Sequence, residues 1–577
     1  MAGQVVGSRN SRRSSAARCP TSTAPSPPRP SPLTTAASAS SSARTAASST
    51  ASPTSITRPT GRGSARDPHL IASISRALST IHRALPSPAV SVEGRLSCTV
   101  SDSDGGGVDR LSALPDALLR GVVSRLPAKD AARTAALSRR WRPVWLSAPL
   151  VLSDAHLLPA ATDAIPSHVS RADADAAAAA VSRVLAVHDG PFCCASLACG
   201  NMDEDRARAR LARWLQHLAV KGVEELLLIN QPPLQLHKHL PATLFSMTAL
   251  TRLYLSFLRF PATAGLPRGA AFPRLRELGL CSVAMGGHED MDFVLARSPA
   301  LEALCFEGHM FPPLRLRLVS RSLRCVQIHY SKVKSVAVVD APCLPRLIVM
   351  NTPLRGEGEV EGSCRIKIGN APSLQLFGYF DPARHALQVG NNDIKAGTLV
   401  SAGAMVPSVK ILALEFHFRV RSDAKMLPSF LRCFPSVERL YIQSNKTNEP
   451  TGKLNFKFWQ QAASGAAIEC VELHVKLLVF HDFRGEKAEL AFLQFFVESA
   501  RALERLVVVC AGGCFASTDE ASSKVRKALF AGKKETGSGR CALLVLENAT
   551  GKDAPAWKYE RGSDFSRADP FAFIVPT

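Results

Sequence analysis

The spacing of apolar residues changes along the chain, and the first stretch with a clear pattern lies between residues 108 and 145. Apolar side chains recur there at helical spacing, at Leu114, Leu118, Leu119, Val122, Val123 and Leu126. This pattern predicts an amphipathic helix of about three turns with one apolar face. Pro115 and Asp116 suit the first turn of that helix, and Pro127 ends it.

A second helix is expected to open at Lys129 and Asp130, and Pro143 is expected to prevent a regular helix from reaching Trp145. A segment of about 40 residues is small for an independent core. Its apolar residues exceed what a lone helical hairpin buries. The surplus apolar surface therefore faces either a partner or the rest of the same chain.

From residue 223 onward the pattern becomes apolar-x-x-apolar-x-apolar, and each recurrence predicts one short strand with alternating faces followed by a return segment. Stacked strands of this kind form a parallel sheet with one continuous core. The organisation resembles an irregular leucine-rich-repeat solenoid, so the predicted fold class is α/β. The eleven repeats begin at Val223, Leu250, Leu275, Leu301, Leu323, Leu344, Leu374, Val409, Val437, Ile468 and Leu503.

Functional residues of such a body are expected on the outward positions of the strands, because the apolar positions form the core. These outward positions mix charged and aromatic residues, which favours a protein partner over DNA. Taken singly, each is also explained as a polar side chain that solvates the sheet. The candidates for target binding are Arg252, Tyr254, Glu307, His329, Arg346, Arg439 and Tyr441.

Two helices are expected between the helical block and the repeats. Residues 171–189 are rich in Ala and end at Gly190, and residues 203–220 begin with acidic residues and carry an apolar face. We interpret residues 151–222 as a helical linker that caps the start of the repeats. Residues 146–166, which are rich in Pro and Ala, are expected to be irregular.

Residues 1–66 contain nine Arg, no Lys and no Asp or Glu among Ser, Ala, Thr and Pro. A segment of this composition buries too little apolar surface to order the chain, so residues 1–107 are predicted to be a disordered head, with a short amphipathic helix at 69–85. The same composition is typical of an organelle transit peptide. A plastid location is therefore the alternative to the nucleus or cytoplasm, and a gene-model extension is a third interpretation.

The net charge of +22 at pH 7 raises the question of an anionic partner. Residues 1–66 supply +9 of it, and the remaining +13 is spread thinly without a dense basic stripe. No apolar run approaches the ~20 residues that span a bilayer. Neither a nucleic-acid nor a membrane partner is predicted. The 15 Cys lie mostly among apolar residues and are expected to be buried, reduced thiols.

Motifs for cofactor, metal or catalytic chemistry are incomplete. Gly356–Gly362 lacks the spacing of a dinucleotide loop, and Gly532–Gly537 lacks the Lys that completes a P-loop. Cys193–Cys199, even with His188, fits no zinc spacing. The sequence therefore predicts no cofactor, no metal site and no catalytic residue, and the chain is not expected to be an enzyme.

Asp109 to Trp145 resembles a plant F-box nearly residue for residue, including the LPD and LP pairs, the KDAARTAALS run and the RRWRPVW end. The resemblance implies a three-helix module that binds a Skp-type adaptor and, through it, a cullin–RING ubiquitin ligase. It also implies that the chain recruits a protein target for ubiquitination. The alternative is a leucine-rich-repeat scaffold that is not engaged in a ligase. The adaptor contacts carry over to Leu114, Pro115, Leu118, Leu119, Val122, Leu126, Leu137, Trp141 and Trp145.

Residues 468–548 resemble the FBD domain that follows the repeats in many plant F-box proteins. The pattern there predicts a strand, a turn at Phe483–Gly485, a helix at Glu489–Ala500 and a strand, with a further strand at Ala542–Leu546. Such a domain would cap the end of the solenoid. The expected domains are the head at 1–107, the F-box at 108–150, the linker at 151–222, the repeats at 223–467, the FBD domain at 468–548 and a tail at 549–577.

Overall fold

The computed structural model of the chain describes Val92 and residues 110–572, except for gaps at 163–165, 167, 232–237, 310–312, 351–363, 383, 398–399, 447–450, 452–453, 465–466, 531–540 and 548–561. The predictions for the head and its helix at 69–85, and for the glycine-rich stretches at 356–362 and 532–537, lie outside the described residues.

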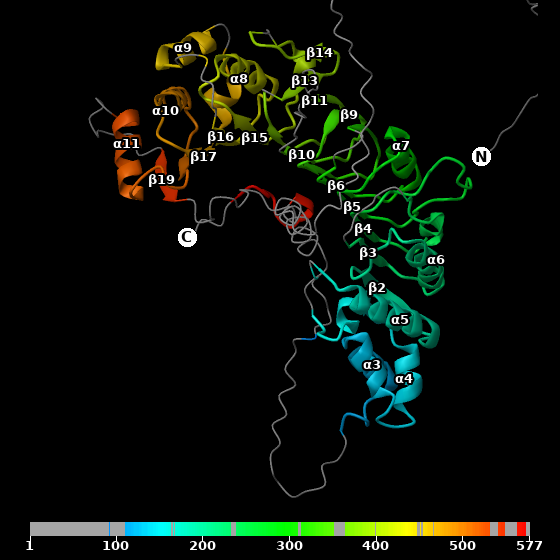
Figure 1. Cartoon of the computed structure of the whole chain (residues 1–577). Helices are drawn as coiled ribbons and strands as arrows, with labels where there is room; N and C mark the ends of the chain where they lie inside the picture. The colour runs from blue at the N-terminus through cyan, green and yellow to red at the C-terminus, as the bar shows by residue number, and fades with distance from the viewer. Residues whose placement is uncertain are drawn as a thin grey trace, which may run out of the picture. The chain divides into compact units, whose positions relative to one another are not determined.

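A single sheet of parallel strands forms the body of the described chain (Figure 1). Its fourteen strands follow one another in chain order, as in a solenoid. This confirms the predicted α/β class with a parallel-sheet repeat region. The strands are β1 Leu150–Ser153, β2 Phe192–Leu197, β3 Glu225–Ile229, β4 Arg252–Ser256, β5 Glu277–Cys281, β6 Ala303–Glu307, β8 Cys325–His329, β10 Arg346–Met350, β12 Leu376–Phe380, β15 Ile411–Phe416, β16 Arg439–Ser444, β17 Leu477–Phe483, β18 Arg505–Cys510 and β19 Ala542–Glu547.

Ten of the eleven predicted repeats begin two residues before one of these strands. The prediction at Ile468 is wrong, because this repeat leads into the short π-helix η4 Cys470–His474 and the strand follows later, as β17. Val471 is buried there, whereas Leu473 is exposed. An apolar pair three residues apart fits a helical turn as well as a repeat, and this explains the error.

The return segments form a second layer, and their structure varies along the chain. The return segments are helices at both ends of the large sheet, whereas in its middle they form a second sheet of five strands (Figure 1). The sequence pattern did not predict this second sheet. The helices are α5 Arg171–Val187, α6 Asp205–Val220, α7 His288–Arg297, α8 Arg421–Cys433, α9 Phe456–Ser464, α10 Lys487–Ser499 and α11 Thr518–Phe530, with short 3-10 turns η1 Ala155–Leu157, η2 Ala242–Ser246 and η3 Ala402–Ala404. The second sheet contains β7 Leu314–Val319, β9 Val333–Asp340, β11 Cys364–Asn370, β13 His385–Val389 and β14 Asn392–Asp393.

The sheet begins earlier than the sequence predicted. Residues 146–166 were expected to be irregular and 151–222 helical, but β1 and β2 lie in these segments and pair in parallel. The carboxylate of Asp154 accepts hydrogen bonds from the backbone N–H groups of Ala198 and Cys199, at 2.9 and 2.8 Å. These bonds tie the end of β1 to the end of β2. Burial raises the pKa of Asp154, and these hydrogen bonds oppose that shift.

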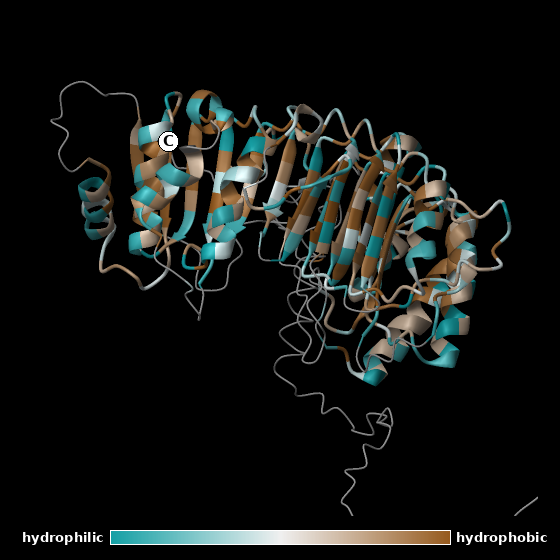
Figure 2. Ribbon diagram, turned by 90° about the horizontal axis from the view of Figure 1, so that it is seen from above, coloured by the Kyte–Doolittle hydropathy of each residue, from teal (hydrophilic) through white to brown (hydrophobic). Residues whose placement is uncertain are grey.

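The main core lies between the large sheet and the return segments. It is one continuous cluster of buried side chains that extends from Leu119 to Leu529. Figure 2 shows hydrophobic and hydrophilic positions alternating along strands of the large sheet. Within the described residues, no helix combines the length and apolar character needed to cross a membrane. Most of the described cysteines are buried as free thiols.

Acid is expected to weaken the fold through two histidines of the large sheet. Burial lowers the pKa of His329 to about 4 and that of His481 to about 4. The unfolded chain protonates near pH 6.5, so it binds more protons than the fold as the pH falls from about 6.5 to 4. The free energy of unfolding is therefore highest above pH 6.5. At pH 5 each histidine has lowered it by about 2 kcal/mol.

The measurement is the urea midpoint of unfolding at pH 7.5 and pH 5.0. We expect His481→Gln to reduce the difference between the two midpoints, and the control His288→Gln, at a half-exposed site, to leave it unchanged. Identical pH dependence in the wild type and His481→Gln would contradict this account.

Candidate functional site

Residues 110–147 fold into three short helices, α2 Asp116–Val123, α3 Ala128–Thr134 and α4 Trp141–Ser147. α2 begins after Pro115, as predicted, but it ends at Val123 and is shorter than the predicted three turns. α3 begins at Ala128, one residue before the predicted start at Lys129. The expectation that Pro143 prevents a helix through Trp145 is wrong. Pro143 is the third residue of α4 and lies in its first turn, where a backbone N–H has no partner within the helix.

The apolar stripe of α2 divides between two sides of the helix. Leu119 and Val123 are fully buried, whereas Leu118 is 56% exposed and Val122 is 38% exposed. Each pair is spaced by four residues, so each lies along one side of the helix. The buried side holds the module together, and the exposed side is an apolar surface that the described residues leave uncovered.

The nine residues predicted to contact an adaptor fall into three groups. Pro115, Leu118, Val122 and Leu137 are exposed, and Leu137 is 64% exposed. Leu114, Leu126 and Trp145 are half-buried against the main core. Leu119 and Trp141 are buried within it.

The structure therefore places Leu119 and Trp141 among the core residues and leaves them no surface for a direct contact. The Trp141 indole N–H donates to Ser112 Oγ at 3.2 Å. The Trp145 ring packs against the ring of His188 in the repeat body, with centroids 5.4 Å apart. The helical block thus packs on the body through one side and presents apolar residues on another.

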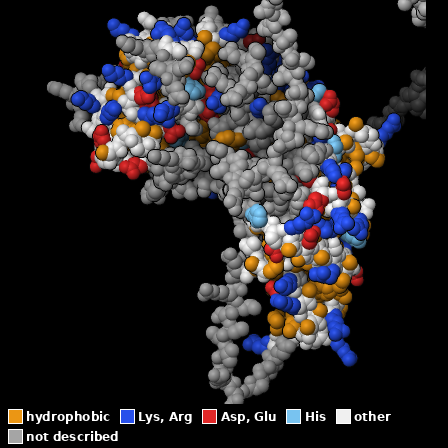
Figure 3. Space-filling model, viewed as in Figure 1, with side chains coloured by type: hydrophobic (Ala, Val, Ile, Leu, Met, Phe, Trp, Pro, Cys, Tyr) orange, Lys and Arg blue, Asp and Glu red, His pale blue; other side chains and the backbone are white. Residues whose placement is uncertain are grey.

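Sequence reasoning missed Leu111, which is 49% exposed and precedes α2. The sequence feature that could have indicated it is the spacing, because Leu111 lies three positions before Leu114. In the structure, Arg140 holds this segment in place. Arg140 donates to the backbone oxygens of Ser112 and Leu114 and pairs with Asp116 at 2.8 Å. We name the exposed apolar residues of this module, Leu111, Leu118, Val122 and Leu137, the helical-block patch; apolar side chains interleaved with Lys and Arg are visible in this region at the bottom of Figure 3.

The large sheet has one face turned away from the return segments, which we call the open face. All seven candidates for target binding lie on this face. Parallel register aligns them in rows across the strands. Arg252, Arg346 and Arg439 open their strands, and Tyr254 and Tyr441 stand two residues further on. Glu307 and His329 are paired neighbours at the ends of β6 and β8.

The part of the open face on β3 to β5 forms a closed network of polar contacts. Arg252 pairs with Glu277 at 3.0 Å and with Glu225 at 3.7 Å, and the Tyr254 hydroxyl donates to Glu277 at 2.6 Å. The Tyr254 ring lies over Gly279, where a Cβ atom would approach the ring to 2.4 Å. Burial raises the pKa of Glu225 and that of Tyr254. The charged and hydroxyl groups of Arg252, Tyr254 and Glu277 therefore bind one another within the sheet.

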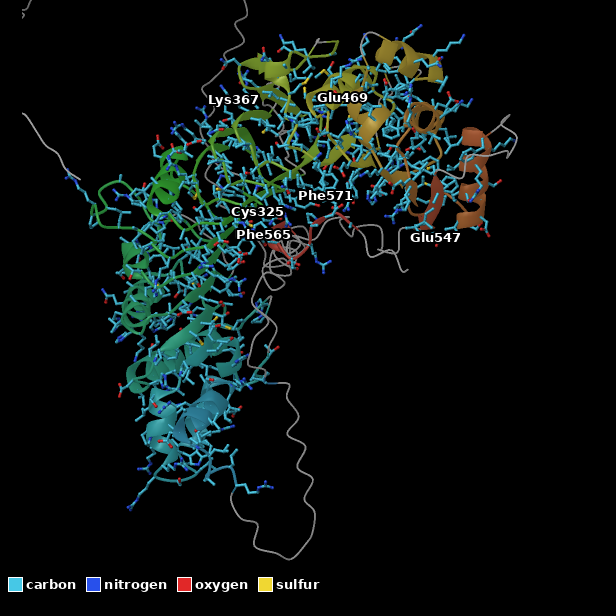
Figure 4. All side chains as sticks on the ribbon, turned by 180° about the vertical axis from the view of Figure 1, so that it is seen from behind. Cys325, Lys367, Glu469, Glu547, Phe565 and Phe571 are labelled. Carbon is cyan, nitrogen blue, oxygen red and sulfur yellow. The ribbon has the colours of Figure 1, made fainter. Side chains whose placement is uncertain are left out.

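The middle of the open face is covered by residues 562–572 of the same chain, which we call the C-terminal strap. Arg346 donates to the backbone oxygens of Gly562, Asp564 and Arg567. Arg439 and Tyr441 both bind the carboxylate of Asp569, each at 2.8 Å. Figure 4 shows Cys325, Phe565 and Phe571 together on this inner side of the sheet.

The sequence analysis assigned no role to the strap. Glu307 and His329 are buried as well. Of the seven candidates only Arg439 is exposed, and it is paired with Asp569 of the strap. The available signal was the run DFSRADPFAF near the C-terminus, which concentrates Phe and Asp in a stretch without a repeat pattern.

Comparison with known proteins finds family models that match three parts of this chain. The F-box domain model matches residues 111–152, the model for the LRR repeats of FBD-associated F-box protein At5g56370 matches 211–442, and the FBD model matches 466–508. F-box/FBD/LRR-repeat protein At2g04230 of Arabidopsis thaliana is 24% identical over 70% of this chain and 89% of its own length. F-box/LRR-repeat protein 13 of the same plant is 22% identical over 70% and 89%. F-box/LRR-repeat protein At3g60040 is 31% identical over 38% of this chain and half of its own length.

The fold, a three-helix module joined to a parallel-sheet solenoid, is that of a repeat protein. The chain therefore carries F-box, LRR and FBD domains in this order, and it is similar to F-box/FBD/LRR-repeat proteins of Arabidopsis thaliana.

The two sides of α2 should respond differently to truncation. Leu119→Ala removes a fully buried side chain, and such changes cost about 2–5 kcal/mol of unfolding free energy. Leu118→Ala acts at an exposed position and should change it by less than about 0.5 kcal/mol. Urea unfolding followed by tryptophan fluorescence measures both, since Trp141 and Trp145 lie in the same module. Equal losses in the two variants would contradict the division of α2 into a core side and a free side.

Proposed function

We propose that this protein is the substrate-recognition subunit of a Skp–cullin–F-box ubiquitin ligase. Proteins of the F-box/LRR/FBD family are typically such adaptors and are generally non-catalytic. The observation that carries the proposal is the helical-block patch: in a segment that matches the F-box model, Leu118 and Val122 expose apolar side chains along one side of α2.

An exposed apolar surface of this kind favours a protein partner. Transfer of apolar area out of water contributes about 25 cal/mol per Å², so leaving these side chains in water forgoes that gain. The four patch residues come from three separate segments of the module, before, within and after its first two helices. The partner we propose is a Skp-type adaptor, which would connect the chain to a cullin.

The solenoid is then the part that holds the target. In this arrangement the chain supplies no reacting group: it holds a protein close to a ubiquitin-conjugating enzyme, and the gain in rate comes from proximity and orientation. The charged and aromatic side chains of the open face are the groups that suit recognition of a protein target.

Binding to the adaptor should depend on the exposed side of α2. We expect the double variant Leu118→Asp/Val122→Asp of the full chain to bind a purified Skp-type adaptor at least about 30-fold more weakly than the wild type, the loss of about 2 kcal/mol typical of a central interface residue. Isothermal titration calorimetry measures the dissociation constants directly.

Val220→Asp is the matched control, because Val220 is an equally apolar residue, 89% exposed, on α6 outside the F-box. It should bind the adaptor like the wild type. Failure of the wild type to bind any Skp-type adaptor would overturn the proposed function and favour a repeat scaffold outside a ligase. Wild-type affinity in the double variant would remove these two residues from the contact.

A further inference from the structure

The C-terminal strap is held on the open face in the manner of a bound peptide. It pairs with no strand of the large sheet: Gly562 and Ser563 are helical, and the residues after them form turns and bends. It reaches the sheet through side chains of β8, β10, β12 and β16, more than 100 residues earlier in the chain. Figure 1 shows it on the inner side of the curved row of strands.

The first half of the strap is bound mainly through its backbone. Arg346, which is buried, donates to Gly562 O at 2.7 Å, to Asp564 O at 3.0 Å and to Arg567 O, and Cys325 Sγ lies 3.3 Å from Gly562 O. The guanidinium groups of Arg324 and Arg346 lie over the Phe565 ring, 3.9 and 4.9 Å from its centroid. Backbone oxygens are present in every peptide, but this half of the site also holds the Phe565 ring, and a Cβ at Gly562 would approach Gln327 Oε1 to 2.1 Å.

The second half of the strap is bound through two side chains. The Asp569 carboxylate is buried and accepts hydrogen bonds from Arg439 and Tyr441 on one oxygen and from the Phe571 backbone N–H on the other, at 3.0 Å. The hydrogen bond to Asp569 raises the pKa of the Arg439 guanidinium. A neutral aliphatic side chain at this position would lose the hydrogen bonds from Arg439 and Tyr441, and a cationic side chain would face the Arg439 guanidinium at 2.8 Å.

Phe571 fills the apolar part of the same site. Its ring lies edge-on to Tyr379 and Tyr441, with centroids 5.1 and 5.5 Å apart, and only 2% of the residue is exposed. It belongs to an apolar cluster on the open face, separate from the main core, that also contains Ile348, Met350 and Val479. Without an occupant this cluster would be an exposed apolar patch.

We propose that the open face of β10, β12 and β16 is a peptide-binding site selective for an acidic residue followed two positions later by an aromatic residue, and that the C-terminal strap occupies it in cis. A segment of the same chemistry from another protein displaces the strap. Describing that protein as the ubiquitination target rests on the proposed function; the site itself does not.

The strap and its binding site belong to the same chain, and this affects how binding of a separate peptide can be measured. A tethered occupant competes at an effective concentration of about 1 mM, so a peptide added in trans binds the wild type weakly. Weakening the strap exposes the site. The test uses the full chain with Asp569→Ala/Phe571→Ala and a fluorescein-labelled peptide of residues 562–572, and fluorescence anisotropy gives the dissociation constant.

We expect the peptide to bind the strap variant at least tenfold more tightly than it binds the wild type. Adding Arg439→Ala to the strap variant should abolish binding. The matched control is Arg505→Ala, which changes an exposed arginine two strands further along the same row of the sheet. It should leave binding intact. No binding to the strap variant, or equal binding of a scrambled peptide, would overturn the proposal.

A second measurement avoids any variant that fails to fold. Hydrogen–deuterium exchange of the wild-type chain, with the peptide at about five times the effective concentration of about 1 mM, should show faster exchange at residues 562–572 than without peptide. Unchanged exchange would equally overturn the proposal. Neither experiment contains an adaptor, so their failure is distinct from failure of the F-box to bind one.

Discussion

The parallel register of the large sheet is the constraint on which the rest of the structure depends. Because side chains alternate along a strand, a slip of one residue would exchange the core face and the open face. Register places Leu253, Leu278 and Leu304 beside one another in the core, and Arg252, Glu277 and Ala303 beside one another on the open face. The return segments vary in length and kind without disturbing this alignment, because they lie outside the ladder of strands.

Most of the strand order was predictable from the sequence, since ten of the fourteen strands of the large sheet follow the local apolar spacing of the repeats. The kind of return segment was not, because helices and the strands of the second sheet cover the same apolar face of the large sheet. The edge strand β1 was missed because it has four residues, too few to show a period. Pro143 was misjudged because a proline has opposite effects in the first turn and in the interior of a helix.

The candidate sites were predictable to different degrees. The helical stripe located the first module, but α2 is apolar on two sides, and spacing alone cannot tell whether Leu118 or Leu119 faces the core. Repeat spacing located the open face and its residues Arg346, Arg439 and Tyr441. It could not reveal their partner, because the strap has no period and binds residues more than 100 positions away. The C-terminal segment, which the sequence predicted only as a tail, therefore contains the strap that occupies the predicted surface.

In this account the helical-block patch of the F-box binds an adaptor, and the open face of the solenoid binds a peptide. The most direct test is ubiquitin transfer by a reconstituted ligase containing the strap variant, with a reporter protein fused to residues 562–572. The account predicts that this reporter is ubiquitinated and that a reporter whose fused segment carries Asp569→Ala/Phe571→Ala is not. Equal modification of the two reporters, or of neither, would contradict it.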